Sequence, residues 1–304
     1  MERNITLDYF KLLLSILVIT IHSSIGDSGL GGALLVKGVA RLAVPCFLVI
    51  NGYFIFNILD NSAKFKKHIW HIVLLFIVWS FVYVPIGTWV FASLKQMLIE
   101  TATGGFWHLW YLYSLILASI LLYLVKKVNS NVLLVIACVL YLTGYVLQKF
   151  EIFNIHTMIH PRNFLFMGFP FLFIGYYINK NKLDKKNINK SILFGSVFIL
   201  FMLHMIETYI SCKHELISTD FSLFLIILCP LLFLAVMKVS VYKEGDGYIS
   251  KLASAIYFNH LMILFFVRSV FQVTDLYGFP LTLFFCFILG NSIILLNKKI
   301  KIFI

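Results

Sequence analysis

The chain contains ten apolar runs, and each is long enough to cross a bilayer as a helix. A transmembrane helix needs about 20 predominantly apolar residues to span roughly 30 Å of hydrocarbon. The expected limits of the ten runs are 6–25, 33–59, 69–91, 106–125, 131–149, 163–179, 191–210, 219–238, 249–271 and 279–297. Only 12% of the 304 residues are charged, whereas soluble domains carry about 25%. The pattern predicts an all-α polytopic membrane helix bundle that forms one domain over residues 1–304.

Lysine and arginine residues are distributed unevenly between the two sets of loops. Seventeen of the 25 fall on one predicted side: Arg3, Lys64, Lys66, Lys67, Lys126, Lys127, Lys180, Lys182, Lys185, Lys186, Lys190, Lys238, Lys243, Lys251, Lys298, Lys299 and Lys301. Five fall on the other side: Lys95, Lys149, Arg162, Lys213 and Arg268. Because cytoplasmic loops carry the excess of basic residues, this bias predicts that both chain termini are cytoplasmic. The net charge of +12 therefore reflects topology and contact with membrane lipids, and no nucleic-acid partner is expected.

The second run is long and contains Pro45 and Gly52, which predict a kink or break in its helix. The five cysteines are scattered, with no spacing typical of a metal site or a disulfide framework. His156 and His160 have a metal-like spacing, but Pro161 follows directly and no acidic or cysteine partner is close in the sequence. We therefore expect no metal site.

Lys11 and His22 are polar residues within the first run, where the bilayer makes them costly. At a rise of about 1.5 Å per residue, they stand roughly 16 Å apart along a helix axis. Lys11 then lies near the cytoplasmic end and His22 near the outer end. Asp8 shares a helix face with Lys11, so Lys11 forms either a local ion pair or a phosphate site. His22 is either a proton acceptor for a hydroxyl group or a structural histidine at the interface.

Further polar side chains occur in later runs. Arg41 lies within the second run and needs an acidic partner, a water-filled cavity or an anionic ligand, unless it extends to the outer surface. Arg162 precedes the sixth run and is interpreted as an outer anchor or a ligand-binding group. Tyr257 and His260 share one face near the middle of the ninth run. They either order the core or take part in chemistry.

Aromatic residues open the fourth run, in the sequence Gly104-Gly105-Phe106-Trp107-His108-Leu109-Trp110. Tryptophan at the end of a membrane span is typical of an interfacial belt. Aromatic faces also stack on sugar rings, and His108 is placed to hold a hydroxyl group. Both interpretations remain open from this segment alone.

Four sequence elements resemble those of the family-3 integral membrane acyltransferases, which O-acetylate cell-surface glycans in bacteria. They occur in order as Lys11-x10-His22, the helix from Arg41 to Phe54, His108-Leu-Trp-Tyr-Leu112 and Tyr257-x-x-His260. Two departures are a lysine at position 11, where arginine is common in the family, and Asn51, where the family has serine. The resemblance covers nearly the whole chain and agrees with ten spans.

The resemblance implies a bacterial plasma-membrane enzyme that uses acetyl-CoA as its acyl donor. It implies that Lys11, with Asp8 beside it, meets the nucleotide phosphate. His22 would act as general base or carry the acetyl group, and Arg41 would stabilise charge on the thioester oxygen. Tyr257 and His260 would orient groups at the midplane.

The resemblance also implies an acceptor, a glycan or lipid-linked sugar, held at the outer face. The residues expected to hold it are Trp107, His108, Trp110 and Arg162. Two other classes of function suit the same polar residues. One is a glycan or small-molecule transporter or exporter, and the other is a non-catalytic component of a larger surface-polymer machine. The sequence leaves the acceptor and the oligomeric state open.

Overall fold

A computed structural model describes residues 2–90, 107–152, 160–213, 220–273, 275–300 and 302–304, together with residues 93, 95, 96 and 99. Within these residues the chain is a helix bundle with one small two-stranded sheet, as the apolar pattern predicts. Eight helices in the described part are long and apolar enough to cross a membrane. The sixth predicted run forms a short helical turn and a 12-residue helix, and the eighth forms a shorter apolar helix.

The structure gives each element the following bounds. The long or medium helices are α1 Ile5–His22, α2 Leu30–Lys37, α3 Ala43–Leu59, α4 Ser62–Val90, α6 Trp110–Val125, α7 Ser130–Ile152, α8 Phe169–Lys180, α9 Lys190–Lys213, α10 Leu225–Lys238, α11 Tyr248–Phe271 and α12 Asp275–Ile300. The short helical turns are η1 Ser24–Asp27, η2 Val39–Leu42, η3 Trp107–Leu109, η4 Phe164–Gly168 and η5 Leu183–Lys185. The strands are β1 Glu2–Asn4 and β2 Tyr242–Glu244.

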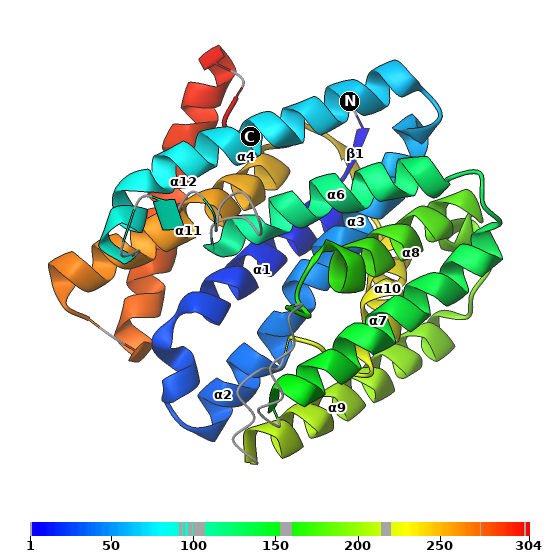
Figure 1. Cartoon of the computed structure of the whole chain (residues 1–304), viewed down its shortest axis with the longest axis horizontal. Coiled ribbons are helices and arrows are strands. Elements are labelled where there is room, and N and C mark those ends of the chain that lie inside the picture. Colours follow the sequence, from blue (N-terminus) through cyan, green and yellow to red (C-terminus); the bar gives the residue numbers. More distant parts are fainter. Residues whose placement is uncertain are drawn as a thin grey trace.

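Helices α1 and α3 run through the middle of the bundle, with α11 and α12 on one side and α7 and α9 on the other (Figure 1). The outer helices expose aliphatic and aromatic side chains, among them Val135 and Leu142 on α7 and Phe198 and Ile206 on α9. A wide apolar exterior of this kind suits contact with lipid acyl chains. The central position of α1 places Lys11 and His22 among other helices.

Helices α3 and α8 pack closely along their backbones, and small residues allow this approach. A Cβ atom added to Gly52 would lie 1.8 Å from the carbonyl oxygen of Leu172, and one added to Gly175 would lie 2.0 Å from that of Val49. Only glycine permits this backbone approach, which is a common basis for helix association in membranes. The pair forms a rigid support for the residues at both ends of α3.

The second predicted run is broken, but the break lies at Gly38 rather than at Pro45 or Gly52. Gly38 ends α2, and the turn η2 then leads into α3. Pro45 occupies the first turn of α3, where the missing backbone N–H has no helical partner to lose. Gly52 serves the contact with α8 instead. The break turns Arg41, on η2, towards the interior.

Several predicted boundaries also differ from the structure, among them the starts of the third and eighth runs. Helix α4 begins at Ser62 rather than at residue 69, because the charged segment with Lys64 and Lys67 continues the helix beyond its apolar part. Helix α10 begins at Leu225 rather than at residue 219. The described residues before it, 220–224, form no helix and are bonded by side chains of other helices.

The basic loops that we assign to one side lie together at one end of the bundle. Strand β1 pairs with β2 so that Arg3 stands opposite Lys243. The ammonium group of Lys238 donates to the carbonyl of Lys186 at 2.5 Å, and that of Lys180 donates to the Ser130 hydroxyl at 2.6 Å. The position of these loops at one end of the bundle agrees with their assignment to one side of the membrane. The location of that end in the cytoplasm stays a prediction.

Candidate active site

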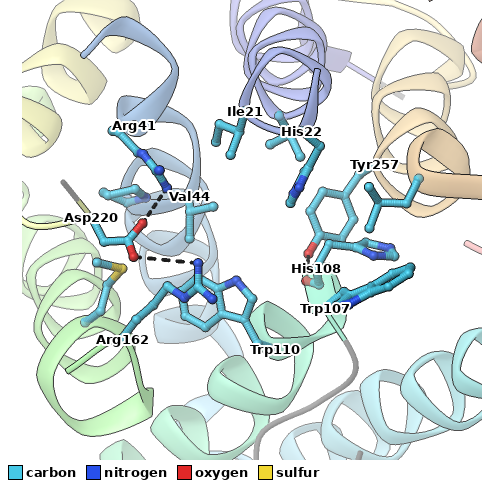
Figure 2. A pocket seen from close by; sticks show the side chains of 14 residues that line it. Ile21, His22, Arg41, Val44, Trp107, His108, Trp110, Arg162, Asp220 and Tyr257 are labelled. Atoms are coloured by element: carbon cyan, nitrogen blue, oxygen red, sulfur yellow. Dashed lines mark hydrogen bonds and ion pairs between the residues drawn. The ribbon is translucent and has the colours of Figure 1, made fainter. Parts of the chain in front are cut away.

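Seven of the predicted site residues line a single cavity, here called the His22 cavity. Its volume is about 230 Å³, and Figure 2 shows the side chains around it. The seven are His22, Arg41, Trp107, His108, Trp110, Arg162 and Tyr257. They come from α1, η2, η3, α6, α11 and the loop before η4, so only the folded bundle brings them together.

His22 is the last residue of α1, and the chain leaves the helix immediately after it. Ser23 has an extended backbone (φ −83, ψ 159), which stops the helix there. The guanidinium of Arg268, on α11, donates to the carbonyl of His22 at 3.2 Å and to the Ser24 hydroxyl at 3.0 Å. A cation at a helix C-terminus satisfies carbonyl groups that lack helical partners. Arg268 therefore fixes the backbone from which the His22 imidazole projects.

Two further histidines lie behind His22. The ring centroids of His22 and His260 are 5.3 Å apart, and those of His108 and His260 are 4.8 Å apart. His260 is fully buried and does not line the cavity. Its Nδ1 lies 2.6 Å from the Tyr257 carbonyl oxygen, so the N–H donates there. A neutral imidazole bonded in this way keeps its lone pair on Nε2, and that atom is buried with no hydrogen-bond partner among the described residues.

Asp220 joins the two arginines of the cavity. One oxygen of its carboxylate accepts from Arg41, and the other lies 3.6 Å from Nη1 of Arg162 (Figure 2). The guanidinium of Arg162 also lies over the Trp110 ring, 5.3 Å from its centroid. Asp220 is the acidic partner that Arg41 requires, and sequence analysis did not identify it. The available signal was an aspartate at the start of the eighth predicted run, on the same predicted side as Arg162.

The loop that carries Asp220 is held through its backbone. The amide of Gln148 bonds both backbone groups of Phe221, at 3.0 Å and 2.9 Å. The hydroxyl of Tyr141 donates to the Ser222 carbonyl at 2.6 Å. These contacts come from α7, and they leave the Asp220 carboxylate little freedom to move.

Helix α9 connects this loop to the break before Arg41. Nδ1 of His204 lies 2.8 Å from the Ser222 hydroxyl, and Nε2 lies 3.2 Å from the Gly38 carbonyl oxygen. The same hydroxyl donates to the Glu207 carboxylate at 2.5 Å. One buried polar network therefore positions both partners of the Arg41–Asp220 ion pair.

Arg162 is positioned by its neighbour Asn163. The side-chain oxygen of Asn163 accepts from the backbone N–H groups of Leu165 and Phe166 at 2.8 Å and 3.0 Å. This cap starts η4 and satisfies two N–H groups that have no helical partner. The guanidinium of Arg162 consequently points to the cavity from a fixed turn.

A second cavity of about 290 Å³ lies on the other side of Tyr257 and is here called the Lys11 cavity. Its polar lining groups include Lys11, Asn51, His68, His71, Tyr111 and Ser250. Nζ of Lys11 lies 3.6 Å from an Asp8 carboxylate oxygen and 3.3 Å from the Ser250 hydroxyl. Asp8 also pairs with Arg3 at 3.2 Å. The local ion pair that the sequence allows is present, and Lys11 still reaches the cavity.

Tyr257 lines both cavities and separates them. Its hydroxyl donates to the His108 carbonyl at 2.7 Å. The rings of Tyr111 and Phe47 lie beside it, at centroid distances of 5.4 Å and 6.3 Å. The three rings form an aromatic wall between the Lys11 cavity and the His22 cavity.

The predicted site residues therefore fall into two groups, one at the His22 cavity and one at the Lys11 cavity. His260 lies behind the His22 cavity, and Asp8 lies beside the Lys11 cavity. Sequence analysis missed Asp220, Arg268, His68, His71 and Ser250. His68 and His71 are three apart on α4, a spacing that places them on one helix face. Of the segments singled out earlier, residues 104–106 and His156 lie outside the described residues.

Comparison with known proteins gives one family match and several distant relatives. The model of an acyltransferase domain family matches residues 4–296. An amino-acid racemase of Enterococcus faecalis is 30% identical over 206 residues, which cover 60% of this chain and 29% of the relative. A second from that organism is 23% identical over 338 residues, covering 97% and 47%. A serine/alanine racemase of Enterococcus gallinarum is 24% identical over 235 residues, covering 66% and 32%.

This chain thus spans less than half the length of these curated relatives. No solved structure matches it.

Proposed function

The chain belongs to the family 3 acyltransferases, and from this premise we propose that it moves an acetyl group from acetyl-CoA to a hydroxyl group of a cell-surface or lipid-linked glycan. The observation that carries the proposal is the position of Tyr257, which lines both cavities. A donor held beside Lys11 reaches the His22 cavity past the aromatic wall of Tyr257, Tyr111 and Phe47. The donor and the acceptor then approach the reaction centre from opposite ends of the bundle.

The Lys11 cavity has the groups that an anionic donor needs. Lysine is a compact charge that binds phosphate well, and Lys11 lies beside Asp8 and Ser250. The imidazoles of His68 and His71 and the Ser250 hydroxyl provide further hydrogen-bonding groups. The remaining lining is largely apolar, which suits the alkyl parts of a pantetheine arm.

His22 supplies the proton transfer in this proposal. Its imidazole takes the proton from the acceptor hydroxyl while the hydroxyl oxygen attacks the acetyl carbonyl carbon. The C–S bond then breaks, and the imidazolium returns the proton to the departing thiolate. The products are an O-acetyl ester and CoA with a free thiol. Arg268 and the His260 ring keep His22 in one orientation.

Arg41 is the candidate for stabilising negative charge on the thioester oxygen. It lines the same cavity as His22, and its Nε is buried with no hydrogen-bond partner among the described residues. A fixed donor aimed at developing charge is among the strongest contributions to catalysis. The bond to Asp220 fixes the plane of the guanidinium.

The test uses the full chain, purified in detergent and incubated with acetyl-CoA and a bacterial surface-glycan extract. We expect release of free thiol and transfer of labelled acetyl to glycan, both lost in His22→Ala. Lys298→Gln is the matched control, because that side chain is exposed and lines neither cavity. Uptake of a glycan into proteoliposomes with no thiol release would instead support a transporter.

A further inference from the structure

We propose that the acceptor carries an acidic group, a carboxylate or a phosphate, on the sugar residue whose hydroxyl is acetylated, and that Arg162 binds it. This inference rests on the proposed function of the His22 cavity and specifies its substrate class.

The described lining of the His22 cavity carries a net positive charge. Two guanidinium groups line it, and Asp220 is the one carboxylate among its described lining residues. Arginine stays protonated at any physiological pH, so the imbalance of one positive charge persists. The other described ionisable groups of the lining are His22, His108 and Tyr257, which carry no negative charge at neutral pH. An anion that enters the cavity removes the imbalance.

Asp220 contacts the two arginines unequally. Arg41 makes a hydrogen bond to the carboxylate, whereas Arg162 is 3.6 Å from it, beyond hydrogen-bond distance. The Arg162 side chain is 37% exposed, compared with 20% for Arg41. The guanidinium of Arg162 lies over the Trp110 ring. Its N–H groups therefore remain available to bind a ligand. A planar guanidinium binds a carboxylate or a phosphate through two parallel hydrogen bonds.

The two arginines and Asp220 lie across the cavity from His22. Figure 2 shows Arg41, Asp220 and Arg162 on one side of the cavity and His22 and Tyr257 on the other. An acid bound at Arg162 leaves the rest of the molecule directed across the cavity to the imidazole. Trp107 and Trp110 also line the cavity, and their faces suit a sugar ring between the two ends. A uronic acid or a sugar phosphate has this combination of ring, hydroxyl groups and charge.

The test measures binding to the purified full chain by isothermal calorimetry, with three probes of the same ring: D-glucose, D-glucuronate and D-glucose 1-phosphate. We expect at least one acid to bind about tenfold or more tightly than glucose, and Arg162→Gln to remove that advantage. Arg162→Lys, which keeps the charge without the fork, should retain part of it. Lys298→Gln removes an exposed charge and should leave binding unchanged. The two acids distinguish a carboxylate acceptor from a phosphate acceptor.

Equal binding of glucose and both acids, or no binding of either acid, overturns the inference. It is also overturned if CoA binding weakens in Arg162→Gln as much as acid binding does, because the anion would then be the donor. Thiol release that depends on His22 and proceeds equally with neutral acceptors would leave the acyltransferase proposal standing without this inference. Acid binding that depends on Arg162, in a protein that releases no thiol, would preserve the site and refute the transfer reaction.

Discussion

One arrangement of charge occurs twice, in the lining of the His22 cavity and beside the Lys11 cavity, and it is built in two different ways. In each, one largely buried aspartate is shared by two basic side chains: Asp8 by Arg3 and Lys11, and Asp220 by Arg41 and Arg162. The partners of Asp8 belong to the first eleven residues of the chain. Arg41 is 179 residues from Asp220 in the sequence. One arrangement is local to the start of α1, and the other exists only in the folded bundle.

The two charge arrangements suit the two cavities to different tasks. Lys11 is a compact charge at the end of a flexible chain, which adapts to a phosphate in several orientations. The arginines are planar groups fixed by a carboxylate, a capped turn and a buried loop. Fixed geometry favours the transition state, whereas an adaptable charge favours binding. Changes at His22 and Arg41 should lower kcat, and changes in the Lys11 cavity should raise the KM for acetyl-CoA.

The largest expected effect is that of His22→Ala on turnover. Loss of a general base lowers the rate by about 10²- to 10⁴-fold, and the KM for acetyl-CoA should stay the same because Lys11 is untouched. Steady-state thiol release gives both parameters. A variant that kept its kcat while its KM rose would reverse the roles assigned to the two cavities.

Asp220→Asn should be the most destabilising of these changes. It leaves two guanidinium groups without their carboxylate, and breaking a buried ion pair costs about 3–5 kcal/mol. The matched variant is Asp8→Asn, whose partners lie within the same short segment. Asp8 joins groups of one short segment, whereas Asp220 joins elements far apart in the sequence, so Asp8→Asn should lower the thermal midpoint in detergent less than Asp220→Asn does. Equal midpoints for the two variants would remove the contrast between local and tertiary charge networks.

Lys11→Met should raise the KM for acetyl-CoA and leave kcat nearly unchanged. A hydrogen bond to a charged group is worth about 1.5–3 kcal/mol, which corresponds to about 10- to 100-fold in affinity. Lys64→Met is the control, because that side chain is exposed and lines neither cavity. Unchanged affinity in Lys11→Met, measured by acetyl-CoA titration, would remove the residue from the donor site.

The spacing of site residues on one helix could be predicted from the sequence. The identity of a partner that depends on contacts between helices could not. Lys11 and His22 share α1, so helical rise alone separates them along the bundle. An acidic partner for Arg41 was one of the alternatives that followed from the cost of a buried charge. Its identity did not, because Asp220 belongs to a loop whose position is set by Gln148 and Tyr141 on α7.

The break in the second run shows the same limit. Pro45 and Gly52 are local signals of a kink, yet α3 continues through both. Gly52 is needed for the approach of α8, and a Cβ atom at Gly38 would lie 2.9 Å from the Met205 sulfur on α9. Which glycine ends a helix is thus decided by its neighbours in space.

Tyr257→Phe should have the smallest effect and bears directly on the boundary between the cavities. The change removes one hydrogen bond to the His108 carbonyl, worth about 0.5–1.5 kcal/mol, and keeps the ring in the aromatic wall. Turnover should fall by no more than about tenfold, and Tyr277→Phe, at a side chain that is 76% exposed, should leave it unchanged. Hydrolysis of acetyl-CoA without acceptor should stay low in Tyr257→Phe and rise in Tyr257→Ala, because only the latter opens the wall to water. If both variants hydrolyse acetyl-CoA at the same raised rate, the hydroxyl rather than the ring separates the two cavities.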